Sequence, residues 1–404
     1  MDVFTQLAPG VIVLDPVELK TNNSMKAKNI ILIAFLGLFI LTGCSDFKEI
    51  QEEGMEPMIL TYIDSVEVIE ANGFLLRPNE TQLINDTLLG VSSIFSKGIW
   101  IFNKVNGLEE LSFINGTYQD ISFYPTKVFW NDYPTLFILD GLSQNILKLE
   151  LGTLQSEYGL QIQKIILDLP EGTRVLPTSK SFWVDDQYFY LELSPENTPK
   201  TSKEFYTKSG DFIGVFNNDG SFEKRMISYP QSLTEFEGFL EPSQVYSSGF
   251  KNKNTSIFSF PSEKILMTIS QLPDSPETFY VPIPKSKYFD YNLPLLEKEF
   301  SINTETKNPQ LHFFGDIKTD GDNYYLQSYM KDNQNLENWS LKSHIVKYNS
   351  KSESWSESID PKEFIHFGEL AGVKNDTLYI LDAGMVNKEQ KYLKKAVLRK
   401  FNSN

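Results

Sequence analysis

Cysteine, histidine and arginine are scarce in this chain of 404 residues, and each scarcity narrows what the protein can be. Cys44 is the single cysteine, so no intramolecular disulfide can form and thiol catalysis is disfavoured. The chain has three histidines. It has 37 lysines and arginines and 53 aspartates and glutamates, which gives a formal net charge of −16. This charge argues against nucleic acid as a partner, because phosphate binding requires basic patches.

Sequence motifs of catalysis are also missing. No G-x-S-x-G motif occurs, and the nearest stretch, GLSQN at 141–145, lacks the second glycine. H-E-x-x-H, the phosphate-binding loop and the dinucleotide-binding glycine motif are absent as well. NNDG at 217–220 and TDGDN at 319–323 carry oxygens suited to calcium, but turns explain both better, since neither has EF-hand spacing. The sequence therefore predicts no catalytic residue, no metal site and no cofactor, and it favours a non-enzymatic binding protein.

One long apolar run is present, close to the start of the chain. Residues 25–44, MKAKNIILIAFLGLFILTGC, combine a methionine, two lysines, a short apolar body and small residues before Cys44. This pattern is typical of a secretory signal peptide and is short for a membrane-spanning helix. Leu-Thr-Gly-Cys resembles the lipobox of bacterial lipoproteins. The resemblance implies cleavage before Cys44 and attachment of acyl chains such as palmitate to its thiol, which would anchor the protein in a membrane.

The signal divides the chain into segments. Residues 1–24 precede it and are predicted to be a non-native extension, 25–43 form the signal peptide, 44–57 an acidic flexible tether, and 58–404 the folded domain. The tether begins SDFKEIQEE and resembles the acidic export signal that surface lipoproteins of Bacteroidota carry after the cysteine. We therefore expect an outer membrane lipoprotein that is exposed to the periplasm or at the cell surface, with the membrane as one partner.

From residue 58 onward the sequence has the pattern of an all-β fold. Short runs of Val, Ile, Phe, Tyr, Trp and Leu are separated by clusters of Asn, Asp, Gly, Pro and Ser. TLFILDG at 135–141 and TLYILDAG at 377–384 nearly repeat one another, and an Asn-Asp pair precedes each. Such pairs favour tight hairpins. The repeating unit is therefore predicted to be a four-stranded antiparallel meander.

The number of units follows from their third strands. Six can be counted: GIWIFN (98–103), NILKLEL (145–151), FIGVFN (212–217), KILMTI (264–269), HIVKYN (344–349) and AVLRKFN (396–402). The last unit lacks a fourth strand, and MILTYID at 58–64 can supply it, which would close a ring and remove sheet edges.

One stretch also points to a family. FILDGLSQNILKLEL resembles a blade of the NHL and TolB-like propellers, and with the lipobox the chain is similar to propeller lipoproteins of Bacteroidota. The resemblance implies a six-bladed β-propeller of four-stranded antiparallel blades over residues 58–404. A seven-bladed propeller and a double β-sandwich are the alternatives.

Candidate ligand-binding residues follow from the propeller layout, in which first strands line a central channel and the loops before them surround one mouth. LHFFGDI (311–317) and IHFGEL (365–370) place His312 and His366 near the start of adjacent first strands. There they could bind a metal together with Asp316 or Glu369, although local packing is the favoured interpretation.

Two arginines and two aspartates complete the set of candidates at the channel mouth. Arg77 and Arg174 lie in loops before first strands, where a guanidinium could bind a carboxylate or a sugar hydroxyl, or could bridge two blades. Asp140 and Asp382 end the two repeated strands on the same face, and turn capping is favoured over catalysis for both.

Two functions from different classes remain. The favoured one is a lipid-anchored binding or scaffold module for a protein, peptide or glycan at the cell envelope. The alternative is a metal-assisted hydrolase or lyase with its site at the mouth of the central channel. A propeller fold alone does not decide between them, because this fold hosts many unrelated functions.

Overall fold

The computed structural model describes residues 54–71, 78–116, 121–152, 160–199, 202, 204–235, 239–240, 245–250, 255–260, 263–270, 273, 275–288, 295–296, 312–331, 341–382 and 390–401. The chain divides into two compact units, Met1–Gln51 and Glu52–Asn404, and every described residue belongs to the second. The predicted signal peptide and Cys44 lie outside the described residues. Helices in the described part are α2 Phe205–Ser209, α3 Gln231–Thr234 and α4 Phe364–Phe367, and none of them has the length and apolar character needed to cross a membrane.

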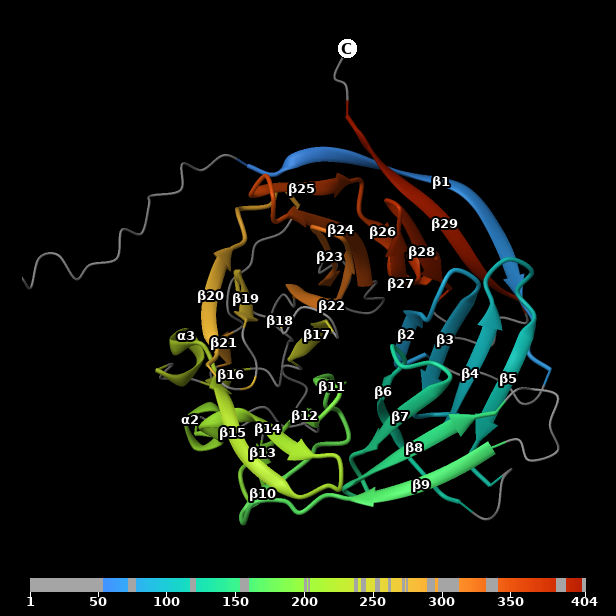
Figure 1. Ribbon diagram of the computed structural model, residues 1–404. Coiled ribbons are helices and arrows are strands. Elements are labelled where there is room, and N and C mark those ends of the chain that lie inside the picture. The colour runs from blue at the N-terminus through green and yellow to red at the C-terminus, as the bar shows by residue number, and fades with distance from the viewer. Residues whose placement is uncertain are drawn as a thin grey trace, which may run out of the picture. The chain divides into compact units, whose positions relative to one another are not determined.

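Strands dominate the described residues and form antiparallel meanders (Figure 1). Four meanders are separate four-stranded sheets. They comprise β2 Glu80–Leu83, β3 Leu88–Ser93, β4 Gly98–Asn103 and β5 Glu109–Ile114; β6 Pro125–Phe129, β7 Thr135–Asp140, β8 Asn145–Leu151 and β9 Leu160–Ile166; β11 Phe182–Val184, β12 Tyr188–Glu192, β14 Asp211–Asn217 and β15 Phe222–Ser228; and β17 Tyr246–Phe250, β18 Thr255–Ser259, β19 Ile265–Ser270 and β20 Glu277–Pro282. Two small pairs accompany them, β10 Thr173–Arg174 with β13 Ser194–Pro195 and β16 Phe239–Leu240 with β21 Leu295–Leu296.

The remaining sheet has nine strands and joins two further meanders through the N-terminal strand β1. Its members are β1 Glu56–Val68, β22 His312–Asp320, β23 Asn323–Lys331, β24 Leu341–Asn349, β25 Ser354–Ile359, β26 Lys362–Glu363, β27 Glu369–Lys374, β28 Thr377–Leu381 and β29 Lys391–Lys400. β1 pairs antiparallel with β29, and its first four residues pair in parallel with β25. The strand predicted at 58–64 thus completes the last meander, as expected. It begins at Glu56, inside the predicted tether, and Met55 before it is already buried.

The meanders follow one another around a ring, with the first strand of each at its centre (Figure 1). β27 contacts β2 and β22, β17 contacts β22 and β11, and β11 contacts β6. β6 also contacts β3 of the first meander, so the circuit of neighbours closes. This propeller-like ring confirms the predicted all-β propeller class. A β-sandwich would instead have stacked two sheets face to face.

Apolar side chains fill the space between neighbouring sheets, which explains why the strands carry apolar runs without alternation. Phe137 of β7 and Phe189 of β12 belong to adjacent sheets and meet edge to face, with ring centroids 5.6 Å apart. Trp130 is fully buried against β3, where a Cβ atom at Gly90 would lie 2.6 Å from its ring. Glycine at position 90 therefore lets the tryptophan of the next sheet lie directly on the β3 backbone.

The sequence prediction is wrong at residues 365–370, where it expects a strand over IHFGEL. The structure has the single turn of α4 there, and β27 begins only at Glu369. Phe364 and Phe367 are both buried, which suits residues three apart on one side of a helical turn, whereas a strand would direct them to opposite faces. Gly368 ends the turn with a φ of +96°, and a Cβ atom there would lie 2.2 Å from the carbonyl oxygen of Leu381.

Candidate functional site

The inner strands enclose a cavity of ≈200 Å³ at the end of the ring where these strands begin. Its charged lining residues are Glu80, Lys127, Lys180, Asp316 and Glu369. Each comes from the first strand of a meander or from the residues directly before it. Charges from five parts of the ring therefore meet in one small space, which corresponds to the predicted mouth of the channel.

Two ion pairs in and beside the cavity satisfy most of these charges. Lys127 Nζ lies 2.7 Å from Glu80 Oε1, while Lys318 Nζ donates to Asp316 Oδ2 at 2.6 Å and to the carbonyl of Thr81 at 2.5 Å. Burial opposes the charged form of Lys127, but the carboxylates of Glu80 and Asp316 together outweigh burial and raise the pKa of this lysine. Burial likewise opposes ionisation of Asp316, but the ammonium groups of Lys318, Lys127 and Lys180 together outweigh it and lower the pKa of Asp316. The charged forms of Lys127 and Asp316 are therefore favoured.

Glu369 and Lys180 have hydrogen-bonding groups that remain available to a ligand. Within the described part of the chain, the carboxyl of Glu369 takes part in no hydrogen bond or ion pair. Burial raises the pKa of this carboxyl from its ordinary 4.5 to about 7. Lys180 Nζ donates to the carbonyl of Asn79 at 2.6 Å, which uses one of the three N–H groups of an ammonium. Burial, together with the nearby ammonium of Lys127, lowers the pKa of Lys180.

Gln327 of β23 fixes the backbone on both sides of Glu369. Its Nε2 donates to the carbonyl of Gly368 at 2.7 Å and to Ser343 Oγ at 2.9 Å, and its Oε1 accepts from the backbone N–H of Leu370 at 2.7 Å. The amide of Gln327 is buried, and such a satisfied network is rigid. The hydrogen bonds of Gln327 thus fix the backbone that carries the Glu369 carboxyl at the cavity wall.

The cavity can therefore present an ammonium and a carboxyl whose protonation changes near neutral pH. A protonated Glu369 donates an O–H, whereas the ionised form only accepts hydrogen bonds. In the protonated state of Glu369, the ammonium groups of Lys127, Lys180 and Lys318 exceed the two remaining carboxylates by one charge. The arrangement suits recognition of a small polar group.

Asp140 caps a turn, as its place after a repeated strand predicts. Its Oδ1 accepts from the backbone N–H groups of Leu142 at 3.0 Å and Ser143 at 2.9 Å. Its Oδ2 accepts from the backbone N–H of Tyr124 at 3.1 Å, in the loop before β6. The turn after β7 and the loop before β6 therefore lie at the same end of the sheet.

The structure brings Asp382 and His366 together through Lys394. Lys394 Nζ forms an ion pair with Asp382 Oδ1 and donates to the carbonyl of His366 at 2.7 Å. The imidazole of His366 is 73% exposed and lies 3.5 Å from the carboxylate of Glu363. Asp382 and His366 do not line the cavity that Glu369 and Lys180 share.

The other predicted residues are more widely spread. Arg174 lies in β10 with an exposed side chain and does not line the cavity. β22 begins at His312, but Arg77 and the side chain of His312 lie outside what the structure describes. Among the described residues, no group of three or more His, Cys, Asp and Glu side chains could hold a metal ion.

Sequence reasoning missed Glu80, Lys127 and Lys180, and it considered Asp316 and Glu369 only as carboxylates near histidines. A signal was nevertheless present. A charged residue stands at the start of several apolar first strands, as in PTKVFW (125–130) and KSFWV (180–184). A charge in an otherwise buried strand requires a partner or a ligand, so this recurrence indicates a polar channel.

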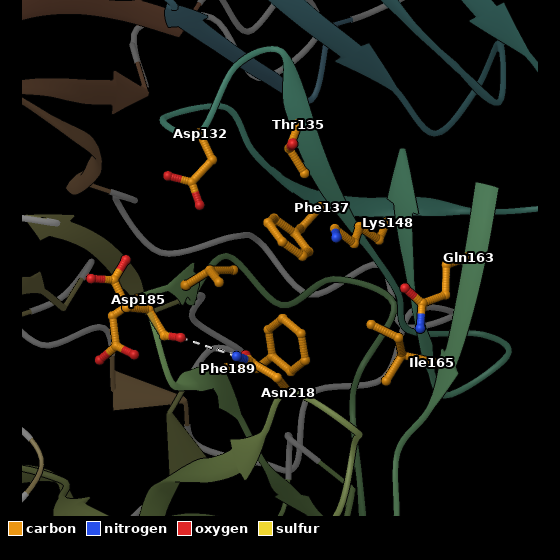
Figure 2. A pocket seen from close by; sticks show the side chains of 11 residues that line it. Asp132, Thr135, Phe137, Lys148, Gln163, Ile165, Asp185, Phe189 and Asn218 are labelled. Carbon is orange, nitrogen blue, oxygen red and sulfur yellow. Dashed lines mark hydrogen bonds between the residues drawn. The ribbon is translucent and has the colours of Figure 1, made fainter. Parts of the chain in front are cut away.

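A second cavity, of ≈520 Å³, lies between the sheets β6–β9 and β11–β15 (Figure 2). Figure 2 shows Phe137 and Phe189 facing each other across it, with Asp185 toward one end. The carboxylate of Asp185 accepts from the backbone N–H of Tyr188 and from the hydroxyl of Tyr190, both at 2.7 Å. The carboxylate of Asp185 is therefore already engaged in its own turn.

Comparisons with known proteins assign no activity to this chain. No family model and no curated protein matches the chain. Among solved structures it is similar to a Bacteroides fragilis protein named as exported, with 10% identity, a TM-score of 0.48, and coverage of 85% of this chain and 96% of that chain. It is also similar to the PQQ-bound aldose sugar dehydrogenase of Streptomyces coelicolor (12%, 0.42, 85% and 98%) and to a streptogramin B lyase (10%, 0.41, 83% and 98%). The names of these proteins point to different activities, so none is assigned to this chain.

Proposed function

We propose that this chain is a lipid-anchored six-bladed β-propeller that acts as a binding or scaffold module for a protein, peptide or glycan at the cell envelope. The count of six treats the nine-stranded sheet as two blades, β22–β25 and β27–β29 with β1 as outer strand, in addition to the four separate meanders. Acyl chains on Cys44 are the proposed anchor. The outer membrane, facing the periplasm or the cell surface, is the proposed location, on the strength of the signal-like run before this cysteine.

One observation carries the proposal of a binding site. At the mouth of the channel, Glu369 and Lys180 line a cavity with hydrogen-bonding groups that the described residues leave unused. Both residues are partly buried, and polar groups withdrawn from water ordinarily have hydrogen-bond partners. A ligand group entering the cavity would supply the missing partners.

The metal-assisted hydrolase or lyase gains no support from the described residues. That alternative requires His366 to reach the channel, and its imidazole is exposed on α4 beside Glu363. The side chain of His312 is outside the described part, so its half of the proposed metal site stays a prediction.

Crosslinking in intact cells, followed by capture of the tagged protein and identification of what is bound, tests the binding role. We expect Lys180→Met combined with Glu369→Gln to lower the recovery of a specific partner at least tenfold. The matched control combines Lys148→Met with Asp132→Asn, both at the second cavity, and should leave recovery unchanged. Equal recovery with all three proteins, or no specific partner for any, would contradict the proposal.

A further inference from the structure

We propose that the cavity at the channel mouth binds a small carboxylate, a monocarboxylic acid of a few carbon atoms, between the ammonium of Lys180 and the protonated carboxyl of Glu369. This inference rests on the proposed binding role of the mouth, and it adds the chemical class of the ligand.

The free hydrogen-bonding groups select the ligand chemistry. Lys180 has one N–H bonded to the carbonyl of Asn79 and two more to offer. Glu369 offers an O–H when protonated, and both groups line the same cavity. A carboxylate has two oxygens with about four acceptor positions, so it can accept from both side chains at once.

The size of the cavity limits the ligand. Pockets for drug-sized molecules usually measure about 300–1,000 Å³. The cavity here measures ≈200 Å³, which suits a ligand of a few non-hydrogen atoms. A whole organic acid of small size fits this space.

The charges around Glu369 favour an anion. Lys180 and Lys318 act on its carboxyl as cations and Asp316 as an anion, while Lys127 and Glu80 line the cavity as a closed pair. Because Lys318 is already paired with Asp316, Lys180 is the ammonium left without a carboxylate when Glu369 is protonated. Lys180 is partly buried, and a charge withdrawn from water without a counter-charge is costly. A bound carboxylate would neutralise it and would at the same time stabilise the proton on Glu369.

The sign of the pH dependence separates this ligand from a zwitterion. Glu369 is half protonated near pH 7 because burial raises its pKa to about 7. A carboxylate needs the protonated form, so its binding should weaken above neutrality and take up a proton. An amino acid would instead place its ammonium on the ionised carboxyl, and its binding should strengthen above neutrality.

Titration calorimetry of the purified protein with propionate, lactate, propionamide and alanine tests the inference. Propionate or lactate should bind. Propionamide and alanine should bind at least tenfold more weakly than the bound acid. The dissociation constant of the bound acid should be about tenfold higher at pH 8 than at pH 6, since each pH unit above the pKa costs up to a factor of about ten. Buffers of different ionisation enthalpy should report uptake of up to one proton at pH 8.

Two variants make the result specific. Glu369→Gln keeps a donor but cannot ionise, so binding should persist without the pH dependence. Lys180→Met should weaken binding at least tenfold, while Lys148→Met at the second cavity should not change it; circular dichroism confirms that each variant is folded. Absence of carboxylate binding at both pH values, or alanine binding that tightens with pH, would overturn the inference. If the mouth variants lose a captured partner but no carboxylate binds, this inference is wrong and the scaffold role stands. If a carboxylate binds but no partner is captured, the scaffold role is wrong and this inference stands.

Discussion

At the scale of single residues, the surroundings of each carboxyl decide what it does. Asp140 accepts three backbone N–H groups and holds a turn. Asp382 ends the same repeated sequence but pairs with Lys394 and accepts from the backbone N–H of Tyr392 at 3.3 Å. Glu369 has neither kind of partner in the described structure, and its carboxyl is left facing the cavity. The motif places both aspartates at strand ends, but the register between β28 and β29 supplies Lys394.

The raised pKa of Glu369 predicts a stability change with pH. The folded protein holds this proton with a pKa of about 7, against 4.5 in the unfolded chain, so the carboxyl lowers folding stability as pH rises from 4.5 to 7. Glu369→Gln removes that penalty. We expect the variant to be more stable than wild type at pH 8, by up to about 3 kcal/mol, and to lose this advantage near pH 4.5.

Urea denaturation at both pH values measures the effect, with Glu150→Gln as the control. Glu150 lies on the surface in an ion pair with Lys148 at 2.6 Å, so its substitution should change stability little at either pH. A Glu369→Gln variant that is less stable than wild type at pH 8 would show that this carboxylate has a partner in the folded protein.

At the scale of elements, the N-terminal strand β1 joins the two meanders of the nine-stranded sheet. It pairs with β29 along ten residues and also touches β25, so it covers the edge that β29 would otherwise expose. Met55, Met58 and Val68, at and beside its ends, are buried. An exposed edge strand promotes association with other chains.

Removal of β1 should therefore destabilise the ring. A chain that begins at residue 69 should lose at least about 4 kcal/mol relative to one that begins at residue 54, from three buried apolar side chains at about 1.5–3 kcal/mol each. It should also self-associate in light scattering through the free edge of β29. A synthetic peptide of residues 54–70 should bind in trans and restore the unfolding midpoint. Equal midpoints for the two chains, both monomeric, would refute the closing role of β1.

At the scale of the whole molecule, the predicted membrane anchor can be tested. The lipobox-like Leu-Thr-Gly-Cys predicts an acyl anchor on Cys44, ahead of a tether that leads into β1. Cys44→Ser should abolish incorporation of labelled palmitate and move most of the protein from the membrane to the soluble fraction. A propeller variant such as Lys148→Met, with Cys44 intact, should stay in the membrane. Membrane retention of the Cys44→Ser protein would argue for another means of attachment.

The sequence by itself determined the repeating architecture. Apolar runs punctuated by Asn-Asp turns specify antiparallel hairpins locally, because turn chemistry and strand composition act between neighbouring residues. The third strands at 98–103 and 145–151 coincide with β4 and β8, and the leftover strand at 58–64 lies in β1 as predicted. The exception is α4, which the local sequence pattern did not predict. There Phe364 and Phe367 are both buried, which favours a helical turn.

Only the tertiary structure decided the site. Glu80, Lys127, Lys180, Asp316 and Glu369 are spread over nearly 300 positions of sequence, and which of them pair depends on which inner strands face one another around the ring. Lys127 meets Glu80 and Lys318 meets Asp316, while Lys180 and Glu369 keep free capacity. Electrostatic pairing is set by distance and burial in space, and neither is encoded by the local pattern of a strand.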